Sequence, residues 1–241
     1  MTRPPGRLLA RPRLAARVSP VTFEGRIVRG VLFDLDGVVA PTLENHVRAY
    51  RETLAPLGIP VEHMVVASRE GQRSQEIIAW IAAGQGKPLA QPRVLELSED
   101  KNRNYRGYPV PAPYPGFREL LETLRARGVR TALATGTHGK NVPHVLGDLL
   151  PLFDAVVAAE DVVHPKPDPE PYVRAAGKVG LDPRECLVVE NAPLGVRSGK
   201  AAGCMVVAIT TTLPAERLKE ADRVLPSIQA VLDLVREGST A

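Results

Sequence analysis

Two aspartates that follow a short apolar segment have the types and spacing to bind a metal ion and attack phosphorus. The segment covers residues 30–33, and Asp34 and Asp36 come next, separated by one leucine. Alternate strand residues share a face, so we expect both carboxylates on one side at a strand's carboxyl end. A cation between them would relieve their repulsion, and oxygen ligands favour Mg²⁺. A carboxylate beside such an ion can attack phosphorus, although a solvated turn has the same spacing.

Two later segments carry polar residues that suit the same chemistry. The largely apolar segment at residues 129–134 leads into Thr135 and Gly136. A hydroxyl and a backbone N–H at that position can hold a phosphoryl oxygen at the start of a helix. Further along the chain, prolines stiffen a turn that contains Lys166. These residues are candidate groups for binding and neutralising a phosphate.

A third apolar segment, residues 186–189, ends in an acid and an amide, Glu190 and Asn191, just before a predicted helix. Taken singly, Glu190 fits an acid at a helix N-terminus, Thr135 a helix cap and Lys166 a solvated turn lysine. Their order along the chain and their positions at predicted strand ends favour a catalytic role for the whole set.

The apolar pattern around these motifs predicts an α/β core interrupted by a helical insert. After Asp36 the apolar period becomes helical over residues 44–55, 75–83 and 94–105, and four prolines within 109–115 then form a stiff return linker. Strands and helices alternate from there on. The predicted strands cover 129–135, 155–158, 186–190 and 205–209, and the predicted helices cover 116–127 and 169–179, with two more that end at 149 and 202. Such alternation predicts a Rossmann-like parallel sheet with helices on both faces, and an active site at the carboxyl ends of its strands.

The predicted organisation has three parts. A basic arm covers residues 1–22, a catalytic core covers 23–40 and 114–241, and a helical cap domain covers 41–113. Residues 1–30 hold seven Arg and one Glu, or +6, whereas the remaining 24 basic and 26 acidic residues give −2. The arm is expected to be disordered. It could be a transit peptide, a tether to nucleic acid or an acidic surface, or an inert extension, and the inert reading is favoured because the arm has one Ser and no sustained apolar stretch.

Composition limits the remaining possibilities. The chain has 241 residues, is 44% hydrophobic and lacks an apolar run of about 18 residues, so we expect a soluble cytoplasmic protein that does not span a membrane. The cysteines Cys186 and Cys204 are expected to be reduced core thiols. We expect a monomer whose partner is a small phosphorylated metabolite, and nucleic-acid binding is not expected beyond the basic arm.

The ordered motifs resemble those of the haloacid dehalogenase superfamily, over about residues 30–236. Within it they are similar to the phosphatases and phosphomutases whose helical cap follows the first motif, such as β-phosphoglucomutases and phosphoglycolate phosphatases. The resemblance implies that Asp34 is a nucleophile that forms a phospho-aspartyl intermediate. It implies that Asp36 protonates the leaving oxygen and then activates the acceptor. Thr135 and the Gly136 N–H would bind the phosphoryl oxygens.

The resemblance also implies how charge is balanced. Lys166 would neutralise charge between the nucleophile and the phosphate, and Mg²⁺ would be bound by Asp34, the Asp36 backbone carbonyl, Glu190 and Asn191. The superfamily commonly has an acid pair where this chain has Glu190-Asn191, so one negative charge is missing. The Asn191 amide oxygen could still bind the ion, or Glu190 alone could do so. Weaker metal affinity is the expected consequence, because ligand charge tunes binding.

Three cap segments, at residues 44–50, 68–70 and 101–105, resemble those of β-phosphoglucomutases. In that family an early cap histidine helps to gate the acid/base residue, and a cap arginine holds the distal phosphate of a bisphosphate. By match these would be His46 and Arg69. Arg73 competes with Arg69, because the loop around it fits a shorter phosphatase-like loop equally well. A helix-face histidine and solvated arginines would be the simpler readings.

These observations favour a Mg²⁺-dependent phosphatase that acts on a small phosphorylated metabolite, with a sugar phosphate as the expected substrate. A mutase would use the same intermediate but return the phosphoryl group to a sugar. A binding protein on the same scaffold, with the arm as its working part, is a weaker alternative, because the motif residues are intact. A dehalogenase is weaker still, since attack on carbon leaves Asp36 without a purpose.

Overall fold

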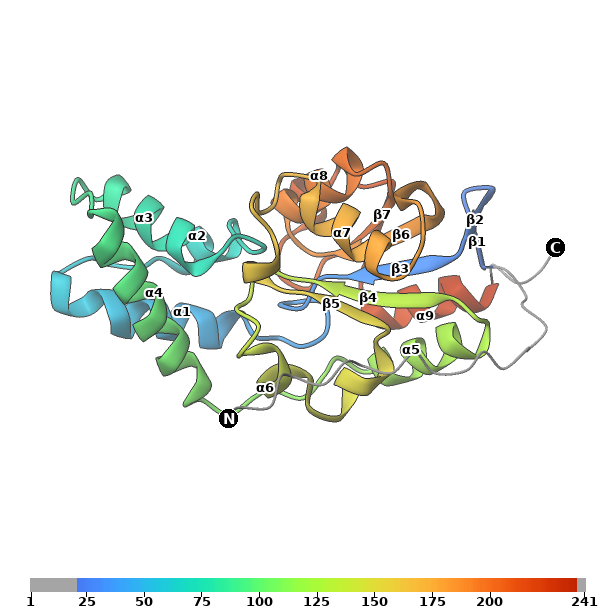
Figure 1. The fold of residues 1–241 in the computed structure, drawn as a ribbon, viewed down its shortest axis with the longest axis horizontal. Helices are drawn as coiled ribbons and strands as arrows, with labels where there is room; N and C mark the ends of the chain where they lie inside the picture. The colour runs from blue at the N-terminus through green and yellow to red at the C-terminus, as the bar shows by residue number, and fades with distance from the viewer. Residues whose placement is uncertain (1–20, 238–241) are drawn as a thin grey trace, which may run out of the picture.

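The centre of the fold is a six-stranded parallel sheet in the computed structural model, which describes residues 21–237 (Figure 1). Its strands are β3 (Gly30–Phe33), β4 (Arg130–Ala134), β5 (Ala155–Val157), β6 (Cys186–Glu190), β7 (Met205–Ile209) and β8 (Arg223–Leu225). The order across the sheet is β5-β4-β3-β6-β7-β8. β3 and β7 are apolar and buried along their whole length, as expected for parallel strands covered on both faces.

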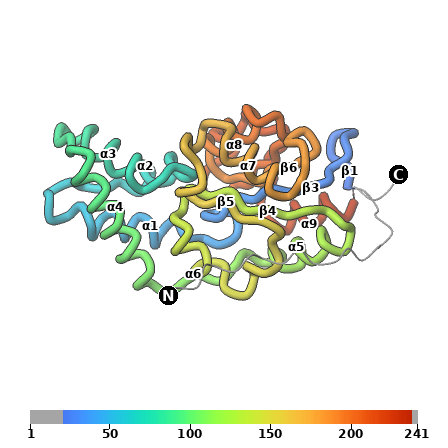
Figure 2. The backbone as a smooth tube through the Cα atoms, viewed as in Figure 1, coloured from blue at the N-terminus to red at the C-terminus, as the bar shows by residue number. Residues whose placement is uncertain are grey.

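Successive residues of β3 face two helical layers. Val31 and Phe33 belong to one apolar cluster, and Leu32 belongs to the other. The first layer contains α5 (Phe117–Ala126), α6 (Val142–Leu146) and α9 (Ile228–Glu237), and the second contains α7 (Glu170–Lys178) and α8 (Pro193–Ala201). Figure 2 shows these layers on opposite sides of the sheet. The predicted Rossmann-like α/β core is therefore confirmed.

The chain between β3 and α5 forms a helical cap that lies beside the carboxyl ends of the strands (Figure 1). Its helices are α1 (Leu43–Leu54), α2 (His63–Ala67), α3 (Ser74–Gly84) and α4 (Gln91–Arg106). They pack around an apolar cluster of their own, which includes Tyr50, Leu54 and Ile78. The helical periods predicted α1, α3 and α4 to within three residues at each end, but α2 spans only five residues and its pattern was too short to predict.

Some elements differ from the sequence-based expectation. An antiparallel hairpin, β1 (Val21–Phe23) and β2 (Arg26–Val28), precedes the sheet, and it begins within the predicted arm. Residues 1–20 of that arm lie outside the described chain. The helix expected to end at 149 stops at Leu146, because Gly147 adopts a positive φ of 50°. Both β8 and α9 were also absent from the prediction.

Short 3₁₀ helices connect the main elements. They are η1 (Ala55–Leu57), η2 (Gly147–Leu152), η3 (Ala159–Asp161), η4 (Pro183–Glu185) and η5 (Ala215–Arg217). Cys186 and Cys204 are buried free thiols, as predicted. Within residues 21–237, none of the helices has both the length and the apolar character needed to cross a bilayer.

Candidate active site

Three neighbouring strands bring the predicted motif residues to one edge of the sheet. β3 pairs in parallel with β4 on one side and β6 on the other, with Phe33 level with Leu133 and Val189. The residues that follow Phe33 and Leu133, and the end of β6, therefore lie at the same edge. Asp34, directly after β3, and Glu190, the last residue of β6, are both buried there. The sequence-based placement of these motifs at the strand ends agrees with this arrangement.

The side chain of Lys166 bridges the ends of β3 and β6 by contacting Asp34 and Glu190. Its Nζ donates to Asp34 Oδ1 at 2.7 Å and to Glu190 Oε1 at 2.6 Å. Burial alone would lower the pKa of Lys166, but the charges of the two carboxylates raise it above its usual value. Burial raises the pKa of Asp34 to about 7, although the Lys166 charge opposes the shift. One ammonium thus faces two buried carboxylates, so it offsets only part of the negative charge at this edge.

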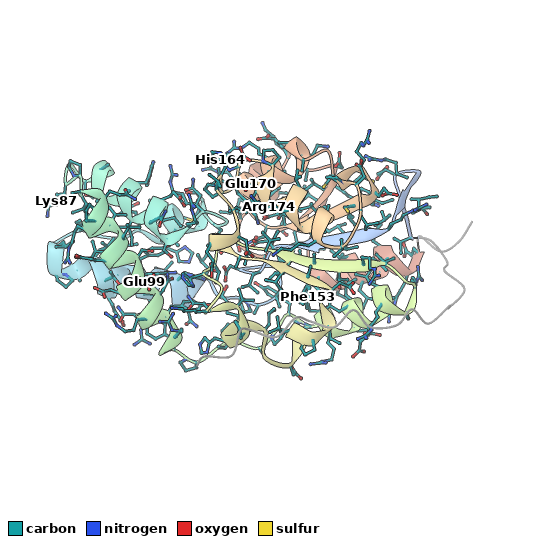
Figure 3. All side chains as sticks on the ribbon, viewed as in Figure 1. Lys87, Glu99, Phe153, His164, Glu170 and Arg174 are labelled. Atoms are coloured by element: carbon teal, nitrogen blue, oxygen red, sulfur yellow. The ribbon has the colours of Figure 1, made fainter. Side chains whose placement is uncertain are left out.

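The loop before α7 sets the position of Lys166. Glu170 is in the first turn of α7, and its carboxylate accepts backbone N–H bonds from Val163 at 3.1 Å and His164 at 2.7 Å. Those N–H groups, with help from Arg174, lower the pKa of Glu170 to about 2. Figure 3 shows His164, Glu170 and Arg174 close together on this side of the core. A charged residue in the first turn of α7 therefore orders the turn that carries Lys166.

Glu190 has a hydrogen bond for each of its lone pairs. Besides Lys166, Oε1 accepts from the Tyr172 hydroxyl at 2.7 Å, and Oε2 accepts the backbone N–H groups of Asn191 at 2.9 Å and Ala192 at 3.2 Å. A carboxylate has about four acceptor positions, so Glu190 is fully satisfied. The start of α8 presses against it, because a Cβ at Gly195 would lie 1.7 Å from Oε1. Glu190 could bind a metal ion only by giving up one of these bonds.

The carboxylate of Asp36 faces the cap. Its Oδ1 accepts from Thr42 Oγ1 at 2.6 Å and from His46 Nε2 at 3.0 Å, and its Oδ2 accepts from Thr137 Oγ1 at 2.5 Å. β3 ends at Phe33, so the alternation expected to place both aspartates around one cation does not reach Asp36. A metal contact from Asp36 would therefore come from its backbone carbonyl. Burial alone would raise the pKa of Asp36, but its contacts with His46 and the threonine hydroxyls lower it below its usual value.

A buried lysine extends this contact into the cap. Lys101 Nζ lies 2.7 Å from His46 Nδ1, and the imidazole stacks on Tyr105 with ring centroids 4.3 Å apart. Burial lowers the pKa of Lys101 to about 7, and burial together with the Lys101 charge lowers the pKa of His46. His46 thus accepts from Lys101 at Nδ1 and donates its Nε2–H to Asp36. These three side chains form a continuous hydrogen-bonded chain from α4 to Asp36.

The cap loop around Gly71 lies directly against the core loops that contain Gly136 and Lys166. A Cβ at Gly136 would lie 2.5 Å from the carbonyl oxygen of Gly71, and a Cβ at Gly71 would lie 2.8 Å from Cδ of Lys166. Only glycine allows such close approach at these two positions. Nearby, Thr135 Oγ1 accepts the Thr137 backbone N–H at 3.0 Å. The glycines from cap and core together permit this closed arrangement.

A small cavity remains between the closed cap and the core. It has a volume of about 30 Å³ and is lined by groups from both parts, including Asp36, His46, Glu70, Lys101 and Thr137. That is room for a few water molecules, so a metabolite can enter only when the cap opens.

The two cap arginines have different surroundings. Arg73 lines a second, smaller cavity with Thr135, Gly136 and Lys166, and it pairs with Glu76 on α3. Arg69 stacks on Trp80, 3.9 Å from the ring centroid, and its guanidinium donates to the Gln72 side chain. Arg69 lines neither of the two cavities that we describe within residues 21–237. The geometry thus brings Arg73, and not Arg69, to the side of the site that holds Thr135 and Lys166.

The oxygen atoms near Asn191 suit a divalent cation. Asn191 Nδ2 donates to Glu70 Oε2 at 2.9 Å and to Thr212 Oγ1 at 2.8 Å. Within the described chain, Glu70 Oε1 and Asn191 Oδ1 are buried without a hydrogen-bond partner. Burial and the charges of Asp36 and Asp34 raise the pKa of Glu70 well above its usual value. Unpartnered buried oxygens in excess negative charge are the donor set that Mg²⁺ prefers.

No three His, Cys, Asp or Glu side chains of residues 21–237 are grouped closely enough to form a ready-made metal centre. An ion at this edge would therefore draw together ligands that now bond to protein groups.

Comparison with known proteins matches this geometry to a family. Residues 28–203 match the protein family described as haloacid dehalogenase-like hydrolase. The chain belongs to this family. Hexitol phosphatase A from Escherichia coli (strain K12) is 32% identical to this hydrolase over 205 residues, which cover 84% of the chain and 93% of that protein. Beta-phosphoglucomutase from Bacillus subtilis (strain 168) is 28% identical over 190 residues, which cover 76% and 83% of the two chains.

A solved structure has the same fold. CbbY from Rhodobacter sphaeroides, in complex with phosphate, superposes on this hydrolase with a TM-score of 0.76 and 26% identity, covering 87% of this chain and 99% of that one. The predicted superfamily is thereby confirmed. With phosphatases and a phosphomutase among its relatives, this haloacid dehalogenase-like hydrolase is a phosphoric monoester hydrolase or a phosphomutase.

The sequence analysis assigned no role to Lys101 or Glu70 at the site of this hydrolase, although it compared the segments that contain them with those of β-phosphoglucomutases. Lys101 had a readable signal, because it shares the apolar register of α4 with Val94, Leu97 and Tyr105 and is buried with them. A lysine in such a register is rarely there without a partner. Glu70 had no comparable signal, since only the packing of the cap loop brings it to Asn191.

Proposed function

We propose that this chain is a Mg²⁺-dependent phosphatase of a small phosphorylated metabolite, a sugar phosphate in the first instance, that works through a phospho-aspartyl intermediate on Asp34. The observation that carries the proposal is the Lys166 ammonium bonded at once to Asp34 and Glu190 at the edge of the sheet. This contact orients the nucleophile and neutralises charge where a phosphate would approach. The names of the relatives support the substrate class, since they include hexitol and fructose-1-phosphate phosphatases.

The first half-reaction transfers the phosphoryl group to the protein. A carboxylate oxygen of Asp34 attacks phosphorus, and the bond between phosphorus and the leaving oxygen breaks. The leaving oxygen takes a proton from Asp36, while Thr135 and the Gly136 N–H hold the phosphoryl oxygens. Bound Mg²⁺ would supply further positive charge to the phosphate, with Asp34, the Asp36 carbonyl, Glu190 and Asn191 as its candidate ligands.

The second half-reaction returns the proton and frees Asp34. The Asp36 carboxylate accepts a proton from the attacking water, whose oxygen bonds to phosphorus as the aspartyl oxygen leaves. The lowered pKa of Asp36 keeps its carboxylate ionised, and so free to accept this proton. The proton that Asp36 gives to the leaving oxygen can come from Lys101 through His46, and the proton taken from water can return along the same chain, because the pKa of Lys101 lies at about 7.

A phosphomutase is the second candidate, and the closed cap favours it. The cavity around Asp36 has a volume of about 30 Å³, so a closed cap admits little water. If the cap closed over a sugar, a sugar hydroxyl would meet the phospho-aspartate before solvent did. Both candidates need the same nucleophile and differ only in the acceptor.

The cap contact that holds substrate is assigned to Arg73 in this proposal. Its side chain lines the small cavity shared with Thr135 and Lys166. A second phosphate or a sugar hydroxyl held there would lie between cap and core. Arg69 is left as a packing group on Trp80.

The deciding experiment is ³¹P NMR of the purified chain with Mg²⁺ and a panel of phosphorylated sugars. The panel contains β-glucose 1-phosphate with a trace of glucose 1,6-bisphosphate, a hexitol phosphate and fructose 1-phosphate. Release of inorganic phosphate from any of these supports the phosphatase. Conversion of β-glucose 1-phosphate to glucose 6-phosphate, without free phosphate, would replace it with the mutase. No change with any substrate, in protein shown to be folded, would contradict both.

A further inference from the structure

The carboxylate of Glu70, in the cap, contacts a residue of the core. It lies in the loop between α2 and α3 and is 6% exposed, although its neighbours Arg69 and Gly71 are less deeply buried. Its Oε2 accepts from the Asn191 side-chain amide at 2.9 Å, across the boundary between cap and core. Neither the proposed reaction nor the motif assignments give this residue a task.

Glu70 and Asn191 each have one side-chain oxygen without a hydrogen-bond partner among the described residues. Glu190 accepts four hydrogen bonds, and the carboxylate of Asp36 accepts three. In contrast, Glu70 Oε1 and Asn191 Oδ1 are buried and have no hydrogen-bond partner among the described residues. Natural proteins rarely leave such atoms unpaired unless an ion or water occupies the space.

The orientation of the Asn191 amide makes this pairing possible. Its Nδ2 donates to Glu70 and to Thr212, which turns Oδ1 away from both acceptors. An aspartate at 191 would have no side-chain N–H to donate, and its carboxylate would repel that of Glu70. The amide at 191 and the carboxylate at 70 therefore form a matched pair, in which the negative charge comes from the cap.

We propose that Glu70 is a metal ligand contributed by the cap, and that it supplies the negative charge that position 191 lacks. This inference rests on the proposed function, because it concerns the Mg²⁺ ion of that reaction. Asn191 Oδ1 is the neutral ligand beside it. A ligand present only when the cap is closed couples the two events: metal binding favours closure, and closure tightens metal binding by the same factor.

Binding of Mn²⁺ alone, followed by the electron paramagnetic resonance signal of the free ion, tests the assignment without turnover. Glu70→Gln keeps the shape and the hydrogen bond but removes the charge, and it should weaken Mn²⁺ binding roughly ten- to a hundredfold. The matched control is Glu99→Gln, which removes the same charge from an exposed position on α4 and should bind as the wild type does (Figure 3). Thermal melts check that each variant folds.

The exchanged pair, Glu70→Gln with Asn191→Asp, sharpens the test. It restores one carboxylate and one amide, so it should recover most of the affinity that Glu70→Gln loses. Asn191→Asp alone places two carboxylates face to face and should hold the cap open. The fluorescence of Trp80, the single tryptophan of the chain, reports on this change, because Arg69 next to Glu70 stacks on its ring.

The outcomes separate this inference from the proposed function. Equal Mn²⁺ affinity in wild type, Glu70→Gln and Glu99→Gln would overturn the role of Glu70 while leaving the metal-dependent phosphatase intact. Wild-type protein that binds no Mn²⁺ would overturn both. Weaker binding in Glu70→Gln, with recovery in the exchanged pair and none in the control, is the result that supports a cap-borne ligand.

Discussion

The core and the cap each bury one lysine beside the site, and the pKa values of the two lysines shift in opposite directions. Lys166 in the core contacts two carboxylates, which raise its pKa. Lys101 in the cap contacts His46 and lies over the rings of Tyr50 and Tyr105, and burial lowers its pKa to about 7. Both side chains are almost fully buried, so burial does not distinguish them. The partners decide that the core holds a fixed charge while the cap holds a proton that can move near neutral pH.

The largest expected effect tests the core side of this comparison. Asp34→Asn should lower kcat by at least about 10⁴-fold, because the amide has nearly the same shape but is a far poorer nucleophile. The measurement is steady-state phosphate release at saturating substrate, with circular dichroism to verify the fold. Asp148→Asn, at an exposed position paired with Arg118, is the matched control. Wild-type turnover in Asp34→Asn would contradict the proposed mechanism.

Removing the core lysine should cost stability. Lys166→Met leaves Asp34 and Glu190 buried without their shared cation, and loss of one partner of a buried ion pair costs about 3–5 kcal/mol. Urea unfolding in the absence of metal measures the free energy of unfolding. A variant as stable as the wild type would show that Lys166 does not balance these charges.

Replacing each of the two cap arginines should affect the KM for substrate differently. Arg73→Ala should raise KM about 10- to 100-fold, since it removes a charged hydrogen-bond donor from the phosphate side of the site. Arg69→Ala should leave KM near its wild-type value, because Arg69 packs on Trp80. Initial rates over a substrate series measure both. The reverse ranking would return the role to Arg69.

The cap lysine predicts a pH effect of a definite sign. With a folded-state pKa of about 7 and an ordinary value of 10.5, Lys101 binds more protons in the unfolded chain between those pH values. Stability should therefore rise with pH through this window, by up to about 1.4 kcal/mol per pH unit from this group.

Lys101→Met should remove that rise and be at least as stable as the wild type at pH 7. Urea unfolding at pH 7 and pH 9 measures the difference. A slope equal to that of the wild type would contradict the low pKa of Lys101.

The smallest expected effect concerns the turn that positions Lys166. The pKa of Glu170 is lowered to about 2, so its contribution to stability is present above its unfolded value of about 4.5 and is lost as the pH falls toward 2. Glu170→Gln should lower the melting temperature at pH 7, and the difference from wild type should shrink as the pH drops through 4. Melting curves between pH 7 and pH 3 test this, with Glu99→Gln as a control that should show no difference at any pH.

Much of the fold could be predicted because strands and helices leave local patterns. β6 and β7 agree with the prediction residue for residue, since each is a short apolar run between turn residues. β8 and α2 escaped prediction because three or five residues hold too little pattern. The hairpin at Val21–Val28 escaped because its charged neighbours placed its first residues within a basic arm.

The sequence by itself determined which groups meet at the sheet edge. Asp34, Thr135 and Glu190 end or follow strands, and the carboxyl ends of parallel strands necessarily lie together, so local pattern was enough to predict their meeting. Only the tertiary structure decided what faces them from the cap. How the helices and loops of the cap rotate and pack decides which arginine lines the site, that Lys101 is buried, and that Glu70 contacts Asn191. Residues far apart in sequence carry no local signal of that packing.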